Sequence, residues 1–160
     1  MRPPLDHMRL RRFSNGREHQ IASAYGNVRD SGQTIHQGWD LEACPGTFAY
    51  AISDGTILKV NNDPNLSDYG RFIVLEFAQE KKQYWAFYAH LSHIMVRKGE
   101  KVPEGKPIAK TGQSGNAEGL PLREAHLHFE IRTSPDPGPG MSNRINPMLI
   151  LNAPEVFLRA

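Results

Sequence analysis

Residues 126–132 read HLHFEIR and alternate polar and apolar side chains at every position. In an extended strand, successive side chains point to opposite faces, so His126 and His128 share one face and the apolar residues between them share the other. We expect the apolar face to enter a core and the histidine face to form a site. A half-exposed sheet face that carries histidines by coincidence is the alternative for an isolated pair.

Short apolar or alternating runs continue this character from Gln33 onward: TFAYAISDGTILKV, RFIVLEF, QYWAFYAHLSHIMV and KPIAKTG. Asp54-Gly55, Lys98-Gly99 and Glu104-Gly105 separate the runs, as in antiparallel strands joined by tight turns. The predicted fold class is therefore all-β: a small antiparallel β-sandwich with a groove across one sheet and few or no helices. A short helix or an edge segment is expected after Pro147.

The stretch VRKGEKVPEGKPIAKTG is similar in form to the hairpin region of lipoyl and biotinyl carrier domains. Such carriers need a modifiable lysine at an exposed hairpin tip, flanked by Met or Asp. None of the lysines here has that setting, so a carrier function is not expected: Lys98, Lys101, Lys106 and Lys110.

A chain of 160 residues has the length of one domain. We expect an N-terminal arm over 1–24, a core domain over 25–134, and a Pro-rich loop and C-terminal segment over 135–160 that packs on the core. The loop follows from Pro135, Pro137 and Pro139, which cannot donate to a sheet ladder.

Charge and cysteine content exclude several function classes. The net charge is +2, too weak for a nucleic-acid footprint but favourable for an anionic polymer such as a bacterial wall. Cys44 is the only cysteine, so neither an intrachain disulfide nor a thiolate metal cluster forms, and we expect it to be a buried small side chain. No apolar stretch approaches the roughly 20 residues of a membrane span, so membrane insertion is not expected.

A second cluster, HQGWD, sets His36 and Asp40 at even spacing on either side of Gly38. If this segment is extended, all three share a face, and the glycine leaves a gap for a cation. Imidazole nitrogen and carboxylate oxygen suit Zn²⁺, and three protein ligands with an open fourth position are typical of catalytic zinc. One histidine of the 126/128 pair would complete the set.

A third cluster, YAHLS, adds His90, which ends a run with Tyr84, Ala86 and Tyr88 on the same face. A histidine bonded to solvent at a strand end is the alternative for His90 alone. Three such clusters in one short β domain favour a common site.

Over about 25–132, the chain resembles the LytM/lysostaphin-type zinc metallopeptidases, a family of peptidoglycan endopeptidases. Six segments carry the resemblance by their order and spacing: HQGWD, DGTILKV, YAHLS, VRKGEKVPEGKPIAKTG, GQSGN and HLHFEIR. The resemblance implies that His36, Asp40 and His128 bind Zn²⁺ and that His90 and His126 are catalytic. It also implies that the peptide stems of peptidoglycan are the substrate. The chain has no HExxH helix to supply a glutamate base, which agrees with imidazoles handling the protons.

The predicted function is thus a zinc endopeptidase that cuts peptide cross-links of the bacterial cell wall. The alternative is a non-catalytic wall-binding or amidase-activating module of the same fold, since some members of the family have lost ligands. All five site positions are retained here. Whether the bond joins D-alanine to diaminopimelate, lies in a glycine bridge or belongs to a protein stays open.

Two departures from the family pattern border the expected groove: Trp39, where a smaller aliphatic residue is usual, and the long approach AEGLPLREAHLHF. Glu130 shares the face of the histidine pair and is either a partner of an imidazole or an exposed strand residue. His7, His19 and His93 are expected at the surface.

The first 20 residues are basic in part but lack the apolar region of a secretory signal. We expect the periplasm or cell wall as the site of action, reached by an unknown export route, as for an injected antibacterial effector or a phage-type lysin. An inhibitor or immunity protein is then an expected partner. No long inhibitory prodomain precedes Gln33, so an unlatched enzyme is expected.

Overall fold

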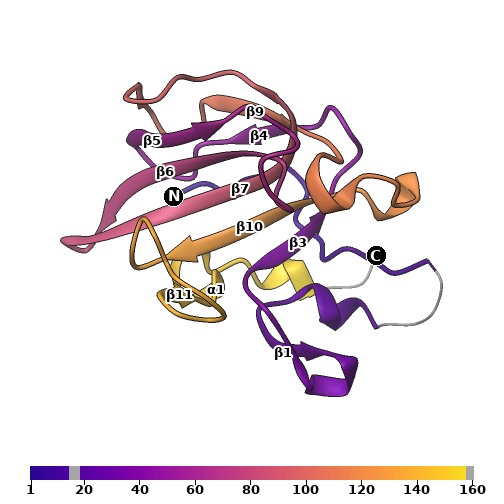
Figure 1. Ribbon diagram of the computed structural model, residues 1–160. Helices are drawn as coiled ribbons and strands as arrows, with labels where there is room; N and C mark the ends of the chain where they lie inside the picture. The colour runs from indigo at the N-terminus through magenta and orange to yellow at the C-terminus, as the bar shows by residue number, and fades with distance from the viewer. Residues whose placement is uncertain (15–18, 158–160) are drawn as a thin grey trace.

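The computed structural model describes residues 1–14 and 19–157, and over these residues it is an antiparallel β protein with one short α-helix (Figure 1). The all-β fold class is confirmed. The strands are β1 Gly26–Arg29, β2 Thr34–His36, β3 Trp39–Glu42, β4 Phe48–Tyr50, β5 Gly55–Asn61, β6 Arg71–Gln79, β7 Lys82–Ile94, β8 Lys101–Val102, β9 Pro107–Thr111, β10 His126–Arg132 and β11 Arg144–Ile145. The helices are α1 Met148–Leu151 and the 3-10 turns η1 Gln20–Ser23, η2 Asp30–Gly32, η3 Gly115–Ala117, η4 Leu122–Glu124 and η5 Pro154–Phe157.

The main sheet runs in the order β11-β10-β7-β6-β5-β8. Strand β3 pairs with β10, β9 pairs with β7 and with β4, and β1 and β2 form a separate two-stranded sheet. Strand β10 therefore lies between β7 on one side and β3 and β11 on the other (Figure 1). This central position fixes the histidine-bearing strand from both edges.

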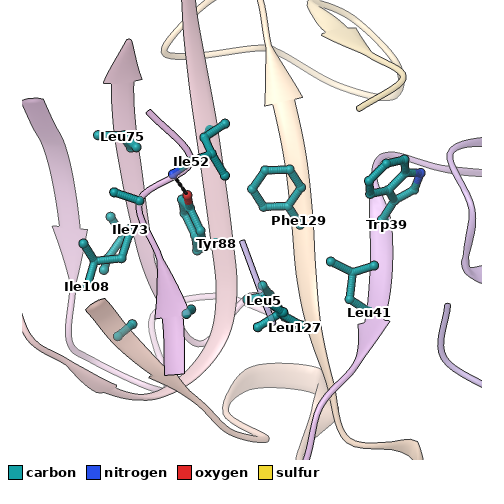
Figure 2. Packing of buried hydrophobic residues seen from close by; sticks show 14 of the residues in the cluster. Leu5, Trp39, Leu41, Ile52, Ile73, Leu75, Tyr88, Ile108, Leu127 and Phe129 are labelled. Carbon is teal, nitrogen blue, oxygen red and sulfur yellow. Dashed lines mark hydrogen bonds between the residues drawn. The ribbon is translucent and has the colours of Figure 1, made fainter. Parts of the chain in front are cut away.

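The core lies on the face of the sheet that carries the apolar residues of β10. Leu127 and Phe129 are fully buried, as the alternation predicts, and they pack with Leu41 of β3 and Tyr88 of β7 (Figure 2). The hydroxyl of Tyr88 accepts a hydrogen bond from the backbone N of Ile52 at 3.2 Å. The buried phenol is thereby satisfied, as a polar group in a core must be.

The opposite face carries a smaller cluster of Val74, Phe87 and Ala89, with Tyr69 packed against it. His128 lies beside this cluster, with its ring centroid 5.7 Å from that of Tyr69. The sheet thus has the main core on one face and the candidate site on the other.

The N-terminal arm contributes to the sheet. Leu10 bridges to Leu41 of β3 in antiparallel fashion, and Leu5 and Leu10 belong to the main core. The domain boundaries at 24 and 134 stay a prediction.

Two expectations about single residues are wrong. Trp39 is fully buried in the main core and does not border the groove, because its side chain leaves β3 on the face opposite Asp40. Cys44 is exposed, because it follows the end of β3 in a loop. The short helix after Pro147 is present as α1, and no helix in the described part of the chain has the length and apolar character needed to cross a membrane.

Candidate metal centre

Strands β3 and β10 place Asp40 directly opposite His128. Paired residues on neighbouring strands project to the same face, and Nδ1 of His128 lies 2.8 Å from Oδ1 of Asp40. Both residues are buried, at 6% and 2% exposed. The pairing register alone brings two of the predicted ligands together.

His36 reaches the same carboxylate from a different sheet. It ends β2, which pairs with β1, and its Nε2 lies 3.1 Å from Oδ1 of Asp40. HQGWD is therefore not one extended strand, because the chain turns between His36 and Trp39. Gly38 was expected to leave a gap for a cation, but the structure gives another reason for a glycine at this position. A Cβ on Gly38 would lie 2.2 Å from the backbone oxygen of Phe129, so only a residue without a side chain fits.

The three predicted ligands fit a zinc ion. One donor atom from each of His36, Asp40 and His128 lies within 4.8 Å of the others. Nδ1 of His36 donates to the backbone oxygen of Ala24 at 2.9 Å, which leaves Nε2 directed at Asp40. Two imidazole nitrogens and one carboxylate oxygen, each carried by a paired strand, are a zinc donor set.

His90 reaches the site through an irregularity in β7. Strict alternation would place it with Tyr88 in the core, but the pairing of β7 with β6 shifts register between Arg71 and Ile73. His90 has φ 58°, a left-handed value that is rare for a residue with a side chain. Bulges and such strained backbone often re-aim side chains at functional sites.

His126 lies beside His90, with ring centroids 5.0 Å apart. Nδ1 of His126 donates to the backbone oxygen of Glu124 at 2.9 Å, and Nδ1 of His90 donates to that of Ser114 at 2.8 Å. In each ring, Nε2 is therefore the nitrogen without a proton in the neutral form.

Glu130 is fully buried and anchors His128 from behind. Its Oε1 lies 2.9 Å from Nε2 of His128, and its Oε2 accepts hydrogen bonds from Nε of Arg132 at 2.7 Å and of Arg144 at 2.9 Å. A carboxylate behind a metal-binding imidazole fixes the orientation of the ring. Of the two readings of Glu130 left open by the sequence, the buried partner of an imidazole is the one found.

The titrations follow from burial and from these contacts. Burial opposes charge on His128, but hydrogen bonds to Asp40 and Glu130 raise its pKa to about 9. Burial, together with the neighbouring His126 and His128, lowers the pKa of His90 to about 3. Burial also lowers the pKa of His126. His90 and His126 are thus neutral near pH 7, with Nε2 unprotonated.

Two arginines at this site were missed by the motif analysis. Nη2 of Arg29, from β1, donates to Oδ2 of Asp40 at 2.8 Å. Nη1 of Arg11, from the N-terminal arm, lies 3.1 Å from Nδ1 of His126. The arm that was expected to leave the site bare therefore adds a side chain to it.

An open pocket of about 640 Å³ connects these groups to solvent. All five predicted site residues line it. Arg11, Arg29, Tyr69 and Leu120 are also in its wall, so the long approach to β10 does border the groove.

The chain is thus a small β protein with a His, Asp and His donor set, a candidate metal site, on the floor of an open pocket. The model of Peptidase family M23 matches residues 34–147, and the chain belongs to this family of zinc metallopeptidases. This confirms the predicted family resemblance.

Named relatives include both enzymes and activators. The chain is 34% identical over 96 residues to the peptidoglycan DD-endopeptidase ShyA of Vibrio cholerae, covering 60% of this chain and 20% of that protein. It is 30% identical over 97 residues to the murein hydrolase activator NlpD of Salmonella typhimurium, covering 61% and 23%. The catalytic domain of the antimicrobial peptidase lysostaphin from Staphylococcus simulans superposes with a TM-score of 0.62 at 27% identity, over 81% of this chain and 89% of that one. The chain thus spans about a fifth to a quarter of the length of ShyA and NlpD.

Proposed function

We propose that the chain is a zinc-dependent endopeptidase that hydrolyses peptide cross-links of bacterial peptidoglycan. The observation that carries this proposal is the convergence, in one pocket, of a three-residue zinc donor set with two further histidines. A site that only bound metal would not need His90 and His126 next to the ligands. The family and its DD-endopeptidase relative supply the substrate class.

His36, Asp40 and His128 would hold the metal. Bound zinc lowers the pKa of a coordinated water toward about 7 and polarises a carbonyl group. The protein's part is to keep the three donors in place. Strands β3 and β10 and the contact from Glu130 to His128 hold two of them, and β2 with the hydrogen bond to Ala24 holds His36.

His90 and His126 would move the protons. Each ring is neutral and presents Nε2 as an acceptor, so one of them takes a proton from the attacking water and delivers it to the leaving amine. The other would take up a proton at Nε2 from solvent, to which the pocket is open, as negative charge develops on the substrate oxygen, and would donate a hydrogen bond to this oxyanion. The geometry gives both rings equivalent backbone support through Nδ1, so the two roles are not assigned between them.

An antibacterial role, in the periplasm or cell wall of a target cell and countered by an inhibitor or immunity protein, belongs to the same proposal. The similarity to an antimicrobial peptidase favours it. Expression directed to the periplasm should arrest growth while cytoplasmic expression does not, and equal harmlessness in both compartments would contradict this role.

A second candidate is an amidase-activating module. Two observations favour it: the similarity to NlpD, and the contact of Arg11 with His126 inside the pocket. Zinc-loaded protein incubated with isolated cross-linked dimers separates the candidates. The endopeptidase converts dimers to monomers and its His126→Ala variant does not, whereas an activator leaves dimers intact and stimulates an added amidase.

A further inference from the structure

Strand pairing places Arg11 on the face of the site. The Leu10–Leu41 bridge sets the arm antiparallel to β3, and the backbone N of Arg11 donates to the oxygen of Asp40 at 2.8 Å. Cross-strand neighbours project to the same face. Leu10 consequently enters the core beside Leu41, and Arg11 points to the metal centre beside Asp40.

The guanidinium of Arg11 is buried without an anionic partner at hydrogen-bond distance. The residue is only 8% exposed, and its nearest recorded carboxylate oxygen, Oδ2 of Asp40, is 3.9 Å away. Its Nε has no hydrogen-bond partner among the described residues. The Phe13 ring, 4.2 Å from Cζ, covers one side of the group.

The contact with His126 satisfies Arg11 only in part. Nη1 lies 3.1 Å from Nδ1 of His126, but that nitrogen already donates to the backbone oxygen of Glu124, and Nη1 lies 3.5 Å from the acceptor Nε2 of the same ring. The imidazole therefore offers one neutral acceptor at the limit of hydrogen-bond distance. Because Nε of this buried guanidinium has no partner among the described residues, the group has capacity for a further, anionic acceptor.

Arg29 adds a second positive charge to the same wall. Its Nη2 is engaged by Asp40, and its Nε donates to the backbone oxygen of Ala22 at 3.1 Å, which holds the side chain in place. Asp68, an exposed residue, is the other carboxylate that lines the pocket. The part of the pocket wall next to the metal ligands, formed by Arg11 and Arg29, is therefore basic.

We propose that Arg11, supported by Arg29, binds a carboxylate of the peptide substrate on a residue next to the scissile bond. This inference rests on the proposed function and narrows its substrate class. Consecutive Cα atoms are about 3.8 Å apart, and Nη1 of Arg11 lies a similar distance, 3.9 Å, from Oδ2 of the ligand Asp40. A D-alanyl–diaminopimelate junction carries a carboxylate on the carbon that holds the reacting amine, whereas a glycine bridge or an amidated stem does not. The planar guanidinium suits bidentate binding of this group.

The test uses two synthetic peptides with the same D-alanyl bond, one with a carboxylate and one with a carboxamide beside the reacting amine. Wild type should prefer the carboxylate by about 10- to 100-fold in kcat/KM. In Arg11→Ala this ratio should fall to near one through a higher KM, and Arg11→Lys should recover part of it. Arg12→Ala is the matched control, since Arg12 is exposed and pairs with Glu42 outside the pocket; it should keep the ratio.

If Arg11→Ala lowers kcat/KM equally for both peptides, Arg11 has a structural role. If it raises kcat/KM equally for both, the N-terminal arm obstructs the pocket. Either result would overturn the proposal. Calorimetric titration of the same peptides into zinc-loaded His90→Ala needs no turnover. Tighter binding of the carboxylate peptide that disappears in His90→Ala/Arg11→Ala supports the subsite, and equal binding contradicts it. If wild type cleaves neither peptide, the proposed function fails, while the titration still decides the role of Arg11.

Discussion

His128 of β10 and Asp40 of β3 face each other across one antiparallel pair, with Nδ1 and Oδ1 2.8 Å apart. The two residues are 88 positions apart in the chain, and only the register of the sheet joins them. His36 adds its Nε2 to the same oxygen. The metal centre is therefore a product of strand pairing.

Removal of a ligand should abolish metal binding and activity together. His36→Ala or Asp40→Ala deletes one of three donors, so zinc affinity should fall by more than the roughly 100-fold that loss of an outer partner costs. Metal analysis after dialysis and a cross-link cleavage assay measure the two effects. Asp136→Ala, at a side chain 80% exposed, is the control, and a His36 or Asp40 variant with full activity would refute the ligand assignment.

Removal of a proton-transfer histidine should separate the two effects. His90→Ala and His126→Ala keep the three ligands, so zinc content should stay stoichiometric while kcat falls about 10²- to 10⁴-fold. His93→Ala, an exposed residue on the same strand as His90, should behave as wild type. Loss of zinc in these variants would instead make the two residues ligands.

Glu130→Gln should weaken zinc binding from outside the ligand set. The change removes the charge that faces His128 and leaves two buried arginines without their carboxylate. We expect a 10- to 100-fold weaker zinc Kd and a loss of about 3–5 kcal/mol in the free energy of unfolding, measured by competition with a chelating dye and by urea titration. Glu155→Gln, at an exposed position, is the control; an unchanged Kd would show that Glu130 does not support the ligand.

Gly38→Ala should disturb the spacing of β3 and β10. Its Cβ would lie 2.2 Å from a backbone oxygen, which cannot move without shifting β10. Both zinc affinity and the urea midpoint should therefore fall. Gly99→Ala, at φ +86° with open space around the added atom, should cost about 1 kcal/mol of stability and leave zinc binding intact. Normal zinc binding by Gly38→Ala would contradict this reason for the glycine.

The two-residue period predicts which side chains of β10 share a face, and the structure agrees for His126, His128 and the apolar residues between them. It fails for His90, because a register shift in β7 turns this residue out of the core. Local alternation carries no information about a bulge that depends on the partner strand.

Arg11 belongs to the site through long-range pairing, whereas Glu130 shares the face of His128 on β10, as the alternation predicts. The bridge between Leu10 and Leu41 brings the N-terminal arm to β3. The sequence of the arm alone does not predict which strand it pairs with. An alternating arginine–leucine–arginine segment, Arg9 to Arg11, was the available signal, since it is the pattern of a short edge strand.

Mass spectrometry of the soluble fragments that zinc-loaded protein releases from purified Gram-negative sacculi, with and without a zinc chelator, tests whether the chain cuts peptide cross-links. We expect loss of cross-linked dimers, cleavage at a bond next to a carboxylate-bearing residue, and full suppression by the chelator. Intact cross-links after treatment with protein shown to contain stoichiometric zinc would contradict this expectation.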